Sequence, residues 1–234
     1  MQSRNPSLSK VRVEHSLAVT KYFILILLLS ASTGWKQNNE HWVKQGSPAS
    51  IGGTIMVDIL DAGFPARYSQ YVVRPSDGTV TRVSEQRFRS RQDESMPRTY
   101  AMPAGAIDSC TGRPEAISPD GKFVAACEGS ARDRDSFVII EHSTKKELVR
   151  WTPAKYRGIR GFAWSPDSRS VAVLNENEHY GKNPLELLSG LSGHPVPHNT
   201  VFVELFVADE WKSTEYVVRK DVINAFTRIL DWKQ

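Results

Sequence analysis

Residues 161–174 read GFAWSPDSRSVAVL and repeat the pattern of residues 114–127, PEAISPDGKFVAAC. Both stretches contain Ser-Pro-Asp, then a basic residue and Val-Ala, and Ser165 lies 47 positions after Ser118. In a type I turn, Pro fixes φ at the second position, Asp is tolerated at the third, and Gly accepts the positive φ that often follows. Each copy therefore predicts a turn that leads directly into a strand.

The two turns differ at their fourth position. The turn residues are Ser118, Pro119, Asp120 and Gly121 in the first copy, and Ser165, Pro166 and Asp167 followed by Ser168 in the second. Because Ser has less conformational freedom than Gly, the second turn must close under a tighter backbone restriction.

The segments that follow both turns are apolar at consecutive positions, in Phe123–Cys127 and in Val171–Leu174. A strand that is apolar on both faces is typically buried on both faces. We therefore expect stacked antiparallel sheets, in which the small side chains of Ala125 and Ala172 let neighbouring sheets approach closely.

Each copy continues into a predicted hairpin, and a weaker hairpin precedes them. The three hairpins pair residues 137–140 with 147–151, residues 200–207 with 214–218, and residues 71–73 with 79–83. A lead-in strand, the turn, a buried strand and a hairpin make four antiparallel strands. Their period of about 40–50 residues is the range of propeller blades.

At these residues the chain resembles TolB-like, WD-repeat-like β-propellers, whose motif is S-P-D-G-K-x-(I/V)-A. Trp164 matches the aromatic residue that often precedes the turn in that family. The resemblance covers residues 113–151 and 160–219, and more faintly 68–83 and a final lead-in strand, residues 226–232. It implies an all-β fold, a partial or small β-propeller built of four-stranded antiparallel blades.

Closed propellers contain about 4–8 blades, whereas the sequence predicts three and a fourth that begins at residue 226. Residues 54–60 form a predicted strand, which favours completion of a ring by the N-terminal region. A partial propeller, a truncated product and one part of an oligomer, joined through open blade edges, are the alternatives.

The N-terminus has the layout of a secretory signal peptide. Four basic residues precede the apolar run 22–31, which is about half the length that a membrane span needs. We therefore divide the chain into a signal peptide (1–34), an N-terminal β segment with a polar linker (35–98) and the two clear blades with a terminal strand (99–234). The prediction is a periplasmic or secreted protein. The alternative is an uncleaved anchor, which would be the only contact of the protein with a membrane.

Without residues 1–32 the net charge falls from +4 to +1, so the composition gives no support for nucleic-acid binding. One basic cluster remains within residues 82–98, a stretch poor in apolar residues, and we interpret it as a solvated linker. The cluster contains Arg82, Arg87, Arg89, Arg91 and Arg98.

The two cysteines, Cys110 and Cys127, lie 17 positions apart. An oxidising compartment permits a disulfide between them, and two small buried thiols are the equal alternative. The sequence predicts no metal site and no cofactor, because no C-x-x-C or helical H-x-x-x-H accompanies the cysteines.

Residues 175–199 are predicted to form a long loop between a buried strand and its hairpin. Asn183 and Pro184 are typical of a helix start, and Gly190 or Gly193 can end a short helix. Long loops on a rigid scaffold often bind a ligand, and the plainer alternative is that the leucines of this helix cover the blade edge.

Candidate binding residues lie in this loop and in the equivalent loop of the first blade. They are Glu178, His179, His194 and His198, together with Arg132, Asp133 and Arg134. Both loops follow the second strand of their blade, so we expect them at one end of the propeller.

No catalytic residue is predicted, since the chain lacks a G-x-S-x-G elbow, a phosphate loop and an H-E-x-x-H motif. The sequence favours a binding module for a protein or a small ligand. A hydrolase or lyase that uses carboxylates and histidines of residues 175–199 is the alternative.

Overall fold

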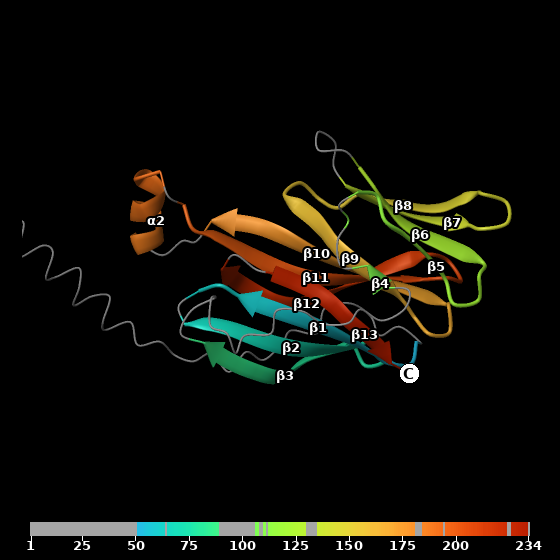
Figure 1. The fold of residues 1–234 in the computed structure, drawn as a ribbon, viewed down its shortest axis with the longest axis horizontal. Helices are drawn as coiled ribbons and strands as arrows, with labels where there is room; N and C mark the ends of the chain where they lie inside the picture. The colour runs from blue at the N-terminus through green and yellow to red at the C-terminus, as the bar shows by residue number, and fades with distance from the viewer. Residues whose placement is uncertain are drawn as a thin grey trace, which may run out of the picture. The chain divides into compact units, whose positions relative to one another are not determined.

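The fold is described from a computed structural model of the chain (Figure 1). The description covers residues 51–63, 65–88, 106–107, 110, 112–129, 135–180, 184–193, 195–223 and 226–233. All of them belong to one unit, Trp42–Gln234. The predicted signal peptide, residues 1–34, lies outside these ranges. Within them, no helix is long and apolar enough to cross a membrane.

The described chain forms three antiparallel sheets and one helix. Sheet A has the order β13 (Phe226–Lys233), β1 (Thr54–Asp61), β2 (Ala66–Arg74) and β3 (Thr79–Phe88). Sheet C has the order β5 (Glu115–Ile117), β6 (Phe123–Glu128), β7 (Ser136–Glu141) and β8 (Glu147–Trp151). Sheet B has the order β12 (Lys212–Ile223), β11 (Pro197–Val207), β10 (Ser170–Tyr180), β9 (Arg157–Trp164) and β4 (Ala106–Ile107). The prediction of an all-β, antiparallel fold is confirmed.

The last strand, β13, completes the first sheet. It pairs antiparallel with β1, from Lys233 opposite Thr54 to Phe226 opposite Leu60. The sequence predicted both segments as strands but assigned β13 to a fourth unit. The structure shows instead that β13 is the lead-in strand of sheet A, so sheet A has the same four-strand order as sheet C.

The two Ser-Pro-Asp turns have the same hydrogen-bond network. In the first, the Gly121 amide donates to the Ser118 carbonyl oxygen at 2.8 Å, and the Phe123 amide donates to Ser118 Oγ at 3.0 Å. In the second, the Ser168 amide donates to the Ser165 carbonyl oxygen at 2.9 Å, and the Ser170 amide donates to Ser165 Oγ at 2.9 Å. The repeated sequence therefore folds into a repeated turn.

The fourth turn residue takes a left-handed backbone conformation in both copies. Gly121 has a φ of 74° and Ser168 a φ of 61°. The Ser168 hydroxyl oxygen accepts a hydrogen bond from the Asp120 amide at 2.9 Å. Ser168 thus adopts a conformation that favours Gly, and its side chain connects the two turns.

Sheet B lies between the other two sheets and shares a hydrophobic core with each. Apolar residues of sheets A and B form one core, and those of sheets B and C form another. The buried run Val171–Leu174 contributes alternately to the two cores, as predicted for a strand buried on both faces. Strand β6 differs, because Phe123, Ala125 and Cys127 face sheet B, whereas Ala126 on the other face is only half-buried.

The interpretation of residues 82–98 as a solvated linker is wrong at its start, whereas the predicted strand 79–83 is present. Arg82 and Arg87 belong to β3, where Tyr71 of β2 lies opposite Arg82 and Arg67 lies opposite Arg87. They lie on the exposed edge strand of sheet A, where charged side chains are common because they discourage pairing with other chains. The other three arginines of the cluster lie outside the described residues.

Candidate functional site

Strands β10 and β11 form a long hairpin, which we call the arm, and β12 pairs with β11 as far as His198. The paired residues of the arm continue from Asn175 opposite Phe202 to Tyr180 opposite Pro197. The predicted loop 175–199 is therefore wrong at both ends, which are strand, and only residues 181–196 connect the two strands. The arm holds the helix α2 (Pro184–Leu191) at its tip, at the opposite end of the molecule from the β7–β8 hairpin (Figure 1).

Helix α2 begins and ends where the sequence predicted. Pro184 is its first residue, and the Gly193 amide closes the end with a hydrogen bond to the Gly190 carbonyl oxygen at 3.0 Å. Gly193 has a φ of 84°, the left-handed conformation typical of the residue that follows a helix.

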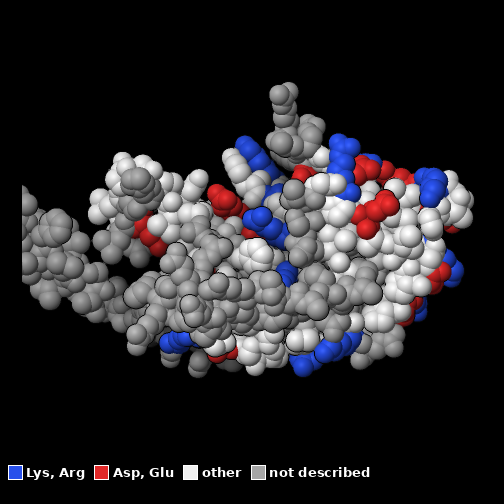
Figure 2. Space-filling view, in the orientation of Figure 1, with Lys and Arg blue, Asp and Glu red and all other residues white. Residues whose placement is uncertain are grey.

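Three leucines of α2 do not cover a blade edge. Leu187, Leu188 and Leu191 are all exposed, and Leu191 exposes 85% of its surface. Residues three and four positions apart share one side of a helix, so these leucines form an apolar stripe. Figure 2 shows a largely uncharged surface over α2, with a small acidic area beside it. Tyr180, at the end of β10, is also exposed.

Two histidine–carboxylate pairs lie below the helix. His198 Nε2 lies 3.1 Å from Glu186 Oε1, and both side chains are largely buried, so this contact joins α2 to the arm. His179 Nε2 lies 3.0 Å from Asp221 Oδ1 of β12. The two imidazoles lie opposite each other on β10 and β11, with ring centres 5.9 Å apart.

The remaining acidic residues of β10 lie apart from this pair. Glu178 is exposed and precedes His179, so its side chain points to the other face of the strand. Glu176 is buried inside the protein, where it binds Arg160 at 2.9 Å and the hydroxyl of Thr227 in β13. Among the described residues, no group of three or more histidine, cysteine or acidic side chains is placed to hold a metal ion.

Four of the predicted binding residues lie outside the described part of the chain. They are Arg132, Asp133, Arg134 and His194. The structure therefore brings together His179 and His198 alone from the predicted set, with Glu178 on the opposite face of β10.

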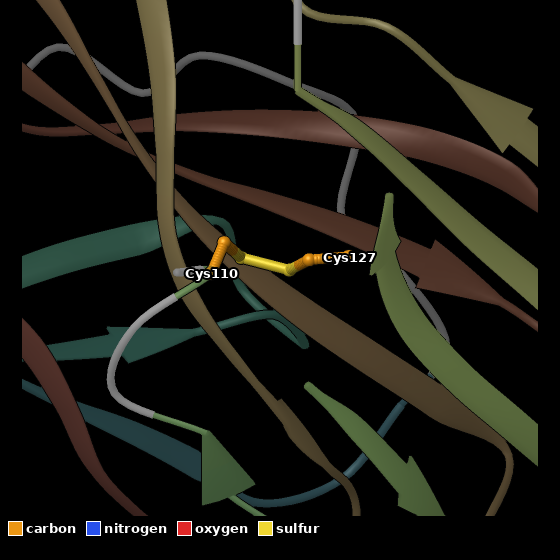
Figure 3. The surroundings of a disulfide bond; sticks show 2 residues. All are labelled: Cys110 and Cys127. Carbon is orange, nitrogen blue, oxygen red and sulfur yellow. A yellow bond between two sulfur atoms is a disulfide. The ribbon is translucent and has the colours of Figure 1, made fainter. Parts of the chain in front are cut away.

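The two cysteines form a disulfide with a Cα–Cα distance of 5.4 Å. Figure 3 shows that the bond connects the segment before β5 to β6. Cys127 is also buried in the core between sheets B and C. The structure therefore contains the disulfide and not the alternative of two free buried thiols.

Sequence reasoning missed the buried charges between sheets A and B. Arg219 of β12 donates to Asp61 Oδ2 at 3.1 Å and to the Tyr71 hydroxyl at 3.2 Å. Asp61 Oδ1 also accepts the amide hydrogens of Gly63 and Ile223. These contacts fix β12 and the start of the arm against sheet A, and the sequence signal was a charged residue directly after the apolar part of each strand.

Burial raises the pKa of two carboxyl groups. The pKa of Asp58 is raised by burial, although Tyr68 donates to Asp58 Oδ2 at 2.5 Å and Arg228 lies nearby. The pKa of Glu204 on β11 is raised by burial, and Glu215 directly opposite raises it further. Asp58 lies in β1, and Glu204 lies in β11 opposite Val173. Neither carboxyl group belongs to the two histidine–carboxylate pairs.

No family model and no curated protein matches this chain. Among solved structures, it is similar to an acylaminoacyl peptidase of Pyrococcus horikoshii in an orthorhombic crystal form, with 12% identity and a TM-score of 0.29. It is also similar to an acylaminoacyl peptidase in complex with Z-Gly-Gly-Phe-chloromethyl ketone, with 12% identity and a TM-score of 0.30. The matches cover 74% and 80% of this chain but 25% of each peptidase. Likeness at this level carries no argument about activity.

Proposed function

We propose that the chain is a secreted or periplasmic binding module without catalytic activity, built on a partial or small TolB-like β-propeller. Two sheets carry the Ser-Pro-Asp turn, and sheets A and C have the four-strand order expected of a blade. The disulfide between Cys110 and Cys127 supports a location outside the cytoplasm, because disulfides persist in oxidising compartments.

The observation that carries the binding role is the exposed leucine stripe on α2. Contact with an apolar surface removes the three exposed leucines from water, which lowers the free energy of the complex. The helix lies at the tip of the arm (Figure 1), and the His198–Glu186 contact fixes its position. The arrangement suits a protein partner with an apolar groove, which is a common way to bind an amphipathic helix.

The proposal is tested by site-specific photo-crosslinking in the expressing cell. A photoreactive residue at Leu188 is expected to give one discrete adduct, and the partner is then identified by mass spectrometry. The same residue at Val83, which is exposed on β3, is the matched control. Replacing Leu187 and Leu191 with Glu is expected to remove the Leu188 adduct. An adduct that persists in this variant, or equal adducts at Leu188 and Val83, would contradict the proposal.

A hydrolase or lyase is the second candidate function, and the paired histidines favour it. His179 is held by Asp221 in the way that a carboxylate orients a general base. Under this view, His179→Gln abolishes turnover of a substrate and leaves the Leu188 adduct intact. Under the binding proposal, the chain turns over no substrate, so the same substitution changes no activity.

A further inference from the structure

The two histidine–carboxylate pairs of the arm share one orientation. In each pair the imidazole Nε2 atom faces the carboxylate, at 3.1 Å from Glu186 for His198 and at 3.0 Å from Asp221 for His179. An ionised carboxylate only accepts hydrogen bonds, so each Nε2 atom carries the hydrogen of its imidazole. A neutral imidazole has one such hydrogen, and each Nδ1 atom therefore keeps a lone pair.

Neither Nδ1 lone pair meets a hydrogen-bond donor among the described residues. His198 Nδ1 is buried and has no hydrogen-bond partner there. His179 Nδ1 lies 3.4 Å from the carbonyl oxygen of Asn177, which is itself an acceptor. A buried acceptor without a donor is unfavourable, because it has lost its hydrogen bonds with water. Both nitrogens are therefore suited to bind an electron-pair acceptor such as a metal ion.

Strand pairing places the two imidazoles on one face of the arm. His179 of β10 lies directly opposite His198 of β11, and the two ring centres are 5.9 Å apart. A zinc ion lies about 2.0–2.1 Å from each imidazole nitrogen that binds it, which separates the centres of two such rings by about 5–6 Å. The observed separation therefore fits two imidazoles that share one ion.

The two carboxylates suit the outer shell of such a site. A histidine that binds a metal usually donates its other N–H to a carboxylate, which fixes the tautomer and makes the binding nitrogen more basic. Glu186 and Asp221 accept from His198 and His179 in this way. They come from α2 and β12, so each imidazole is oriented by a different element. Their two negative charges also balance the charge of a divalent ion.

We propose that His179 and His198 together bind one Zn²⁺ ion through their Nδ1 atoms, with water as the remaining ligands. Imidazole nitrogen is a preferred ligand of Zn²⁺, whereas Mg²⁺ prefers oxygen ligands. No group of three or more potential ligands is in place among the described residues, so water must complete the coordination of the ion. The His179 side chain is 35% exposed, which gives the ion access from solvent. The site does not depend on what binds to α2.

The proposal is tested by calorimetric titration of Zn²⁺ into the full chain, without an affinity tag and freed of metal by a chelator. His179→Gln and His198→Gln, each made alone, are expected to raise the Zn²⁺ dissociation constant by more than about 100-fold, and Asp221→Asn by about 10–100-fold. His142→Gln is the matched control and should bind Zn²⁺ as the wild type does, because His142 follows β7 in sheet C, where its Nδ1 atom lies 3.0 Å from the Gly121 carbonyl oxygen. Absence of Zn²⁺ binding, or unchanged affinity in either histidine variant of the pair, would overturn the proposal.

Nuclear magnetic resonance of ¹⁵N-labelled histidines tests the same site in the unaltered protein. Before Zn²⁺ is added, both imidazoles are expected to carry hydrogen on Nε2. Zn²⁺ should then shift the Nδ1 resonances and leave the Nε2–H signals in place. A metal-free protein with hydrogen on Nδ1 of either residue, or a Zn²⁺ shift at Nε2, would also overturn the proposal. This measurement decides the question even if His198→Gln fails to fold after it loses the Glu186 contact.

These outcomes are separate from those of the proposed function. Replacing Leu187 and Leu191 with Glu should remove the Leu188 crosslink and leave Zn²⁺ binding unchanged. His179→Gln should do the reverse and lose Zn²⁺ binding while it keeps the crosslink. Circular dichroism of each variant checks that the sheets remain folded.

Discussion

Substitutions at Gly121 and Ser168 measure the backbone energy of the repeated turn. Both residues have a positive φ, and a Cβ built at Gly121 meets no heavy atom within 4 Å. The Gly121→Ala substitution therefore adds no steric clash, only the conformational cost of a left-handed Ala, about 1–2 kcal/mol. The lower entropy of the unfolded Ala chain offsets about 0.4–1 kcal/mol of this. We expect a net loss of about 1 kcal/mol in the free energy of unfolding.

The same comparison can be made at Ser168, where the side chain also matters. Ser168→Ala removes the acceptor of the Asp120 amide and keeps the left-handed strain, so we expect a loss of about 1–3 kcal/mol. Ser168→Gly removes the same hydrogen bond but relieves the strain. The difference between these two variants is again Ala against Gly at a left-handed position, and it should equal the cost of Gly121→Ala.

Urea denaturation followed by circular dichroism measures all three variants, with Gly158→Ala as a control. Gly158 also has open space around a built Cβ but no left-handed φ, so this substitution should not lower the free energy of unfolding. If Gly121→Ala proves neutral, or if Ser168→Gly is less stable than Ser168→Ala, then the backbone account of the turn is refuted.

Three further predictions concern the buried bonds and charges. Replacing Cys110 and Cys127 together with Ala should lower the free energy of unfolding by about 3 kcal/mol, because the disulfide closes a loop with a sequence separation of 17. Asp61→Ala should cost about 3–5 kcal/mol in urea denaturation, because it removes the carboxylate that neutralises the buried charge of Arg219. Glu204→Gln should raise the melting temperature at neutral pH, and this gain should vanish below the ordinary carboxyl pKa of 4.5.

The sign of the Glu204 effect follows from its raised pKa. Below pH 4.5 the carboxyl group is protonated in both the folded and the unfolded chain, so burial carries no charge penalty. As the pH rises through the raised pKa, the folded chain must bury a carboxylate beside Glu215, and stability falls. A Glu204→Gln gain that is constant across this pH range would contradict the assignment. An unchanged free energy of unfolding in the cysteine variant or the Asp61 variant would contradict the prediction made for that variant.

Local chemistry made much of the fold predictable from sequence. The Ser-Pro-Asp turns, the consecutive apolar strands and the hairpins depend on residues close together in the chain, and all were found. Helix α2 was predicted for the same reason, since Pro184 and Gly193 favour its two ends. Its exposed leucines were not predicted, because an apolar stripe does not show whether another surface covers it.

The errors came where pairing with a neighbouring strand overrides the local composition. Residues 175–180 contain few apolar side chains, but in the structure they form a strand because Asn175 and Glu176 are buried and Glu176 binds Arg160 and Thr227. Arg82 and Arg87 gave β3 the composition of a linker, although its backbone pairs with β2. In both segments, pairing with the adjacent strands outweighs local composition.

The pairing of β13 with β1 sets the order in which the sheets can be completed during folding. Sheet C contains only residues that are close in the chain, so it can fold first, and sheet B follows. Sheet A must wait for its lead-in strand, and until then β1 keeps an unpaired edge in the nascent chain. An unpaired strand edge invites aggregation. Because this edge is satisfied last, the N-terminal sheet stays open to such association for longest, although its residues are made early.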